Sequence, residues 1–282
     1  MARIATMKVW AVDLGLAVHV EASNGRFIVI DLGSKNGVSP LQALYGKDVG
    51  YLVITHPHYD HFSDIRNIGC VKPDVLTKVK AYTREELMEG VRYSEKEDFE
   101  RYCDFVDQYN CAISENRRPS SGIPFDGLTA RVFSATQCDK RNKNNFSVIV
   151  VLQLGNAKVV VCGDNEKESF DELMSNEDFK KAVAGAIVLV APHHGRDSGF
   201  YLEFVKLVNP YITIISDTTK GPTSVTEKYE AYTKGYEVNN LSTGFSEKRW
   251  CLTTRNDGNI KVLFGESDNP LHLGCLTVYS HY

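Results

Sequence analysis

The sequence predicts an α/β fold in which two β-sheets pack between layers of helices. The first half of the 282-residue chain consists mainly of short strand patterns, interrupted by one charged, helical segment at 81–118. The second half alternates between strand and helix. Sheets and helices each bury an apolar face, and a two-sheet sandwich with outer helices satisfies both. The length suits one large domain, so we expect residues 1–282 to fold as a unit.

The opening segments predict a hairpin followed by further strands. Residues 7–15 and 16–22 alternate or run apolar, and an Asn-Gly turn at 24–25 leads into a third strand at 26–33. Residues 49–55, VGYLVIT, are an uninterrupted apolar run typical of a buried strand, and His56 follows directly.

The segment 81–118 predicts an inserted pair of helices. Thr83 with Glu86, and Ser94 with Glu97, fit the capping-box spacing, in which two side chains satisfy each other's free backbone amides. Two interpretations stay open. The helices can cover apolar core, or they can form a lid that shapes substrate access.

Strand and helix patterns then alternate to the C-terminal region. Strands are expected at 128–135, 146–155, 157–164, 186–195 and 211–217, helices at 165–185, 199–210 and 223–235, and a late hairpin over 249–264. The hairpin is expected to turn at Asp257-Gly258.

Composition limits the classes of function. The formal charge of −4 and pI near 6.1 lack the basic excess that dominates non-specific DNA affinity, so a nucleic-acid partner must be argued from the site. The seven cysteines show no close pairing, which favours reduced thiols. The chain shows neither a signal-peptide pattern nor an apolar run near ~18 residues, so we expect a cytoplasmic protein with no membrane partner.

Residues 54–62, ITHPHYDHF, hold three of the eight histidines of the chain. His56 and His58 are two positions apart on an extended segment, so they point the same way and can hold one ion together. If the chain turns at once, Asp60 and His61 can face a second ion. Imidazole and carboxylate ligands suit zinc or manganese. A chance surface cluster is the alternative.

Two further strand ends supply similar groups. Asp164 follows the run VVVCG, and His193 and His194 follow VLVAP. Open α/β sheets place their sites at such strand ends. The remaining histidines, at positions 19, 272 and 281, are isolated and are interpreted as ordinary core or surface residues.

The motifs THPHYDH, CGD and APHHG, in this order and strand context, resemble those of the metallo-β-lactamase superfamily. The resemblance covers nearly the whole chain and implies an αββα sandwich with two divalent metal ions. It implies that His56 and His58 hold the first metal, Asp60 and His61 the second, and that Asp164 bridges them. His194 would complete the second site, with His193 as the alternative ligand.

One departure concerns the first metal. Most of the superfamily has a further histidine before the bridging aspartate, whereas residues 62–192 contain none. The stretches NNFSVIVVLQLGNAKVVVCGDNEKE and APHHGRDSG are similar to the metallo-β-lactamase domain of the ComEC/Rec2 DNA-uptake proteins and their soluble relatives, which also lack it. The Asn-Asn-x-Ser stretch of that branch is matched here by Asn144, Asn145 and Ser147. The branch also has a GQGD motif, which this chain matches only in part, with Asp13 and Gly15.

The resemblance implies metal-dependent hydrolysis, with Asp60 and Asp164 as catalytic carboxylates that orient the attacking water. The ComEC-like stretches favour phosphodiesters, hence a nuclease or nucleotide phosphodiesterase with Asn145, Ser147 and Arg196 as substrate contacts. Arginine can grip phosphate with two hydrogen bonds. The alternatives are a lactone, thioester or lactam hydrolase, and a metal-holding sensor or binding module with little turnover. The native metal, the exact substrate and the oligomeric state stay open.

Overall fold

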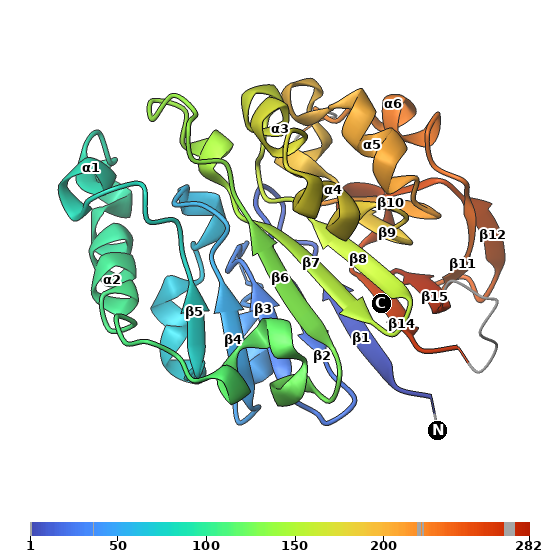
Figure 1. Cartoon of the computed structure of the whole chain (residues 1–282), viewed down its shortest axis with the longest axis horizontal. Helices are drawn as coiled ribbons and strands as arrows, with labels where there is room; N and C mark the ends of the chain where they lie inside the picture. Colours follow the sequence, from blue (N-terminus) through green and yellow to red (C-terminus); the bar gives the residue numbers. More distant parts are fainter. Residues whose placement is uncertain (1, 36, 219–220, 222, 268–273) are drawn as a thin grey trace.

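Two β-sheets lie face to face in the computed structural model, which describes residues 2–35, 37–218, 221, 223–267 and 274–282 (Figure 1). In the described chain the larger sheet has nine strands. Their spatial order is β12 (Ser246–Arg249), β11 (Tyr236–Asn240), β15 (Cys275–Ser280), β14 (Ile260–Gly265), β1 (Ile4–Val9), β2 (Val18–Glu21), β3 (Phe27–Ile30), β4 (Val49–Val53) and β5 (Val75–Thr77). Neighbours from β14 to β3 pair antiparallel, whereas β3, β4 and β5 are parallel.

The smaller sheet has six strands among the described residues. Their order is β13 (Cys251–Thr253), β10 (Ile212–Ile215), β9 (Val188–Val190), β8 (Ala157–Val161), β7 (Ile149–Leu154) and β6 (Thr129–Phe133). The pairs β8–β9, β9–β10 and β10–β13 are parallel. The inner faces of both sheets share one apolar core, in which Val20, Ile30, Val150 and Ile214 are fully buried.

Helices cover the outer faces of both sheets. The smaller sheet packs against α3 (Lys167–Leu173), α4 (Glu177–Val183), α5 (Leu202–Val208) and α6 (Thr226–Glu230), and the larger one against α1 (Arg84–Met88) and α2 (Lys96–Val106) (Figure 1). This arrangement is the predicted two-sheet sandwich between helices. No helix in the described residues is both long and apolar enough to cross a membrane.

The segment 81–118 contains α1 and α2, whose apolar side chains join the core on the outer face of β3–β5. Thr83 and Glu86 form the predicted capping box, with Glu86 N donating to Thr83 Oγ1 at 3.2 Å. The second predicted box, at Ser94 and Glu97, is wrong because Ser94 lies inside a 3₁₀ turn and α2 begins after Glu95 without a side-chain cap. The packing of both helices favours the core-covering interpretation over the lid.

The late hairpin over 249–264 is also wrong. Cys251–Thr253 (β13) belongs to the smaller sheet and Ile260–Gly265 (β14) to the larger one. Between them lies the short helix α7 (Thr254–Asp257), because Thr253 Oγ1 accepts from Asn256 N at 3.3 Å and Asp257 Oδ2 accepts from Thr253 N at 2.8 Å. The chain crosses here between the two sheets.

Candidate metal centre

The first group of site residues follows β4. The chain leaves the strand at Val53, runs extended to His58 and then closes a 3₁₀ turn over Tyr59–His61. His61 N donates to His58 O at 3.0 Å within this turn. The turn brings Asp60 and His61 to the same strand edge as His56, which is fully buried.

Asp164 follows β8, after a glycine that the site requires. Gly163 has φ +56°, and a Cβ there would lie 2.8 Å from the Cβ of Thr55 and 3.1 Å from that of Ser147. Asp164 N donates to Ser147 Oγ at 3.0 Å. The close approach of these segments holds the Asp164 carboxylate against the loop after β4.

His194 lies in a tight turn over Pro192–Gly195 after β9. His193 and His194 both have left-handed backbone conformations, at φ +48° and +54°, which cost energy for residues other than glycine. His193 N donates to Gly163 O at 3.0 Å and so ties this turn to the loop after β8.

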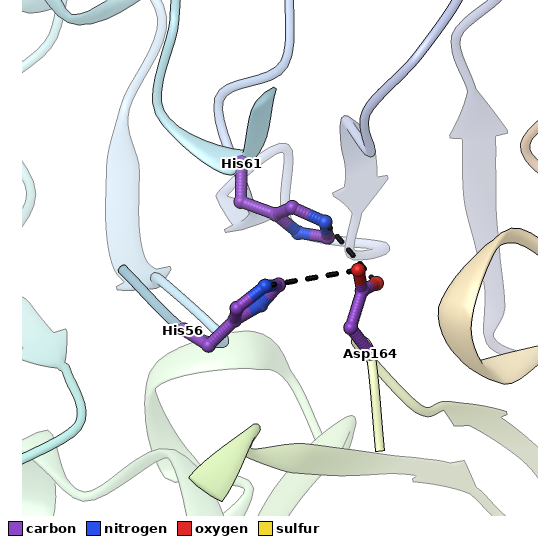
Figure 2. Close-up of side chains that lie close together, drawn as sticks. All are labelled: His56, His61 and Asp164. Carbon is purple, nitrogen blue, oxygen red and sulfur yellow. Dashed lines mark ion pairs between the residues drawn. The ribbon is translucent and has the colours of Figure 1, made fainter. Parts of the chain in front are cut away.

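These three loops bring their side chains together, as Figure 2 shows for His56, His61 and Asp164. One Asp164 oxygen lies 3.2 Å from His61 Nε2, and the other lies 3.7 Å from His56 Nε2 and 3.5 Å from His194 Nε2. Asp60 Oδ2 is 3.5 Å from His194 Nε2 and 3.9 Å from His61 Nε2. Two overlapping metal-binding groups result: His56, His61 and Asp164, and Asp60, His61 and His194.

The orientation of two imidazoles fits metal ligation. His61 Nδ1 lies 2.7 Å from Asp31 Oδ2, and His194 Nδ1 lies 3.0 Å from Ser216 O. Each Nδ1 therefore donates a proton, which leaves a lone pair on Nε2. Both Nε2 atoms are buried and have no hydrogen-bond partner among the described residues. Histidines that hold a cation typically have this arrangement: one ring nitrogen donates to an acceptor that fixes the ring, and the other is buried, unpaired and directed at carboxylates.

The electrostatics of the protein without cations support the same interpretation. Burial opposes protonation of His61 and His194, but nearby carboxylates, that of Asp164 above all, raise the pKa of His61 well above its ordinary value and that of His194 to about 9. Burial would likewise raise the pKa values of Asp60 and Asp164, yet these imidazoles hold both below the ordinary range. In the protein without cations, protons on the two imidazoles therefore compensate the two carboxylate charges, which a bound cation would neutralise instead.

His58 lies farther from the carboxylates than the other ligands expected from sequence. It is half-buried, and its Nδ1 is 3.0 Å from His56 Nε2. It belongs to neither metal-binding group of the described residues. Of the two histidines expected at the first metal, the structure groups only His56 with Asp164, and it places His61 with them where His58 was expected.

His193 points to a different set of partners from His194. Its Nδ1 lies 2.8 Å from both Glu166 Oε1 and Ser198 Oγ, and its Nε2 lies 3.9 Å from Asp164 Oδ2. Because its Nδ1 is hydrogen-bonded beyond the cluster and its Nε2 is farther from the carboxylates, the geometry favours His194 over His193 as the ligand.

The three expected substrate contacts lie in different environments. Asn145 is buried and donates from Nδ2 to Glu168 Oε2 at 2.9 Å, and Ser147 is fully buried beneath Asp164. Both contacts favour a role in positioning the loop after β8 over direct contact with substrate. Arg196 is half-buried, with Nη1 3.3 Å from His193 Nε2 and a buried Nε that lacks a partner in the described chain.

Asp31 is a site residue that sequence reasoning did not identify. It is fully buried at the end of β3, with φ +59°, and accepts from Thr55 N at 2.7 Å and Thr55 Oγ1 at 2.6 Å as well as from His61. The sequence signal is that Asp31 follows the apolar run FIVI of a predicted strand, whereas the parallel pairing of β3 with β4, which places both strand ends at the same edge, is visible only in the fold.

The isolated histidines lie apart from the centre where they are described. His19 is buried against Trp10, with ring centroids 5.4 Å apart, and burial lowers its pKa to about 3. His281 is exposed, and His272 lies outside the described residues.

Several known proteins are similar to this chain in sequence or in fold. The chain is 28% identical in sequence to the ComE operon protein 3 of Bacillus subtilis (strain 168) over 185 residues. The aligned residues span 66% of this chain and 22% of that protein. The metallo-β-lactamase fold protein YhfI from Bacillus subtilis is 11% identical, with a TM-score of 0.49 over 88% of this chain and 100% of that one. Unliganded yeast PDE1 is 10% identical, with a TM-score of 0.43 over 79% and 90% of the two chains.

A family profile gives the assignment. The metallo-beta-lactamase superfamily profile matches residues 11–216, a range that contains the loops after β4, β8 and β9 and therefore all of the clustered side chains. Members of this superfamily are typically metal-dependent hydrolases, and the histidine–aspartate cluster fits their divalent metals. The chain belongs to the metallo-β-lactamase superfamily.

Proposed function

We propose that the protein is a two-metal phosphodiester hydrolase, specifically a nuclease, that uses Zn²⁺ or Mn²⁺. The observation that carries the hydrolase part is that the Nε2 atoms of His61 and His194, which have no hydrogen-bond partner among the described residues, converge on the carboxylates of Asp60 and Asp164. The ComEC-like sequence stretches and the alignment with ComE operon protein 3 support a phosphodiester substrate.

The proposed ligands are those expected from sequence. His56 and His58 hold the first cation, Asp60, His61 and His194 hold the second, and Asp164 serves both. When bound, the two cations lower the pKa of a water molecule toward neutrality and neutralise charge on the phosphate oxygens.

The side chains of the chain supply orientation and proton acceptance. Asp31 and Ser216 O fix the tautomers of His61 and His194, so both Nε2 atoms stay available as ligands. Asp60 and Asp164 are ionised. Both Asp164 oxygens face imidazoles, whereas Asp60 faces them through Oδ2, so the other Asp60 oxygen can accept a hydrogen bond from the attacking water. Arg196 Nη1 lies 3.3 Å from His193 Nε2, and this guanidinium can donate to a non-bridging phosphate oxygen.

The test is hydrolysis of bis-p-nitrophenyl phosphate and of labelled DNA and RNA strands with added Mn²⁺ or Zn²⁺. Asp60→Asn is expected to abolish turnover with little change in fold. Asp48→Asn is the matched control, because the Asp48 side chain is 61% exposed and its one ion pair among the described residues is with Arg26 at the protein surface. Cyclic nucleotides in the same panel separate a nucleotide phosphodiesterase from a nuclease.

The rival functions have distinct outcomes. Turnover of a lactone or thioester with every phosphodiester intact assigns the protein to the other hydrolase class. Tight metal binding with no turnover of any ester assigns it as a sensor or binding module. Either result refutes the phosphodiesterase proposal.

A further inference from the structure

The free edges of the two sheets face each other on one side of the molecule, where β5 ends the larger sheet and β6 ends the smaller one (Figure 1). Three adjoining hollows of about 350, 470 and 760 Å³ follow this opening. Thr77 lines all three, Lys78 and Lys80 line two, and Val132 and Phe133 also line two. We call this continuous depression the seam groove.

The charge of the seam groove is opposite to that of the protein. The charged side chains that line it are six basic residues and two acidic ones, Asp74 and Asp178. The basic residues are Lys78, Lys80, Arg117, Arg118, Arg131 and Lys140. The lining itself thus carries six positive and two negative charges on a chain whose net charge is −4, although Asp107, Glu86 and Glu115 pair with three of the basic side chains from just outside it. Such a concentration of one sign attracts a polyanion.

Part of this positive charge is not paired within the protein. Lys80 and Arg117 form no ion pair within 4 Å in the described part of the chain. Two other lysines pair loosely: Lys78 Nζ lies 3.6 Å from an Asp107 oxygen, and Lys140 Nζ lies 3.9 Å from a Glu86 oxygen. Ion pairs near the surface contribute little to stability, so a phosphate can replace the carboxylate at little cost.

The wall of the groove also offers aromatic surface. Phe133 and Tyr109 are half-buried and line different hollows. A positively charged groove with aromatic side chains is the arrangement that proteins use for single-stranded nucleic acids, because phosphates contact the cations while unpaired bases stack on the rings. A duplex keeps its bases paired inside and gains nothing from these rings.

The groove comes close to the metal centre at one end. Phe146 and Val148 line its first hollow, and Val148 N donates to the carbonyl of Thr55, the residue before His56, at 2.8 Å. Between them, Ser147 accepts a hydrogen bond from the backbone of Asp164. The segment 146–148 thus separates the groove from the clustered ligands, and a strand in the groove would pass over this segment to reach them.

We infer that the seam groove binds the backbone of a single-stranded nucleic acid and guides it to the metal centre. This inference rests on the proposed phosphodiesterase function and assigns its substrate as a strand several nucleotides long. The contacts are electrostatic and do not distinguish one base from another. Binding is therefore expected to be independent of base sequence and to weaken steeply as the salt concentration rises.

The test compares two double variants of equal charge. Lys80→Glu with Arg117→Glu changes the groove, and Lys206→Glu with Lys248→Glu is the matched control. Lys206 is on α5, and Lys248 is on β12 at the opposite edge of the larger sheet. Binding of a fluorescent 30-nucleotide DNA strand is measured by anisotropy in EDTA over a range of salt, and turnover of bis-p-nitrophenyl phosphate is measured with Mn²⁺.

The groove variant is expected to bind the strand at least about tenfold more weakly than the control. The slope of log affinity against log salt concentration should be smaller in magnitude by about 1.4 for the groove variant. Each phosphate contact to a single strand contributes about 0.7 to this slope, and two contacts are lost. Turnover of the small diester should equal that of the control, since that substrate does not extend into the groove. Preference for a duplex competitor over a single strand would contradict the stacking part of the inference.

Equal strand binding by both variants overturns the inference and leaves the two free sheet edges as candidates for pairing with a polypeptide strand. Failure of the phosphodiesterase proposal gives a different result, because wild type would then leave bis-p-nitrophenyl phosphate intact whatever its affinity for DNA.

Discussion

Replacing Asp31 by asparagine tests whether the outer contacts of His61 prepare it for metal binding. Asp31 is fully buried, and its carboxylate accepts three hydrogen bonds of 2.6–2.7 Å, two from Thr55 and one from His61 Nδ1. Asparagine has nearly the same shape and keeps one acceptor oxygen for Thr55 N. Its amide nitrogen stands where Oδ2 accepted from His61, so it donates to Nδ1 and moves the imidazole proton to Nε2.

The expected effect has two components. Loss of a hydrogen bond to a buried carboxylate lowers the free energy of unfolding of the metal-free protein by about 1.5–3 kcal/mol. Loss of the outer contact of a metal-ligating histidine lowers metal affinity by about 10–100-fold. Guanidinium unfolding in EDTA measures the first component, and competition against a Zn²⁺ chelator measures the second.

Asp257→Asn is the control for this experiment. Asp257 is also buried, accepts from Thr253 N at 2.8 Å and pairs with Arg249 at 3.2 Å, but it contacts none of the proposed ligands. It should lose stability and keep its metal affinity. Wild-type affinity in Asp31→Asn, or an equal loss in both variants, would refute the tautomer argument.

Three further predictions concern the loops that carry the ligands. Gly15→Ala should lower both stability and metal content. A Cβ at Gly15 would lie 2.3 Å from Asp60 O, and the φ of +123° costs a residue other than glycine about 1–3 kcal/mol. Elemental analysis measures the metal content, and Gly69→Ala, where the space is open, should leave it unchanged. His194→Gln should remove one of the two binding steps in a metal titration while His193→Gln keeps both, and the opposite result would make His193 the ligand. The pKa of His194 is raised from about 6.5 to about 9, so its contribution to stability without metal is complete below pH 6.5 and lost as pH rises toward 9. Thermal unfolding in EDTA should show this decline, and a midpoint that rises over that range would contradict the assignment.

The order of strands and helices could be predicted for the segments with strong apolar patterns. The buried runs that became β4, β7, β8, β9 and β10 are continuous in β-branched and apolar residues, so their patterns identify them without a partner. The edge strands β5 and β12 were not predicted. β12 is the polar segment SEKR, and β5 has only three residues, so both exist because a neighbouring strand offers hydrogen bonds.

The late hairpin shows why local pattern fails at a crossing between sheets. Two strand patterns with an Asp-Gly turn between them satisfy every local criterion for a hairpin. The chain instead forms one helical turn, since Asp257 accepts from Thr253 N and β13 and β14 find partners in different sheets. Which sheet a strand joins depends on long-range pairing, which the local sequence does not contain.

The sequence by itself determined which residue types are available as ligands and that they follow strands, because HxHxDH, the Gly-Asp pair and the His-His-Gly triplet are local patterns. Only the tertiary structure decided what supports them. Asp31 lies 30 positions from His61 and becomes its partner because β3 and β4 pair in parallel and end at one edge. The basic seam groove is likewise absent from the overall charge, since the fold gathers lysines and arginines from separate segments between two sheet edges. A charge count sums over the whole chain, whereas binding depends on which side chains the fold places side by side.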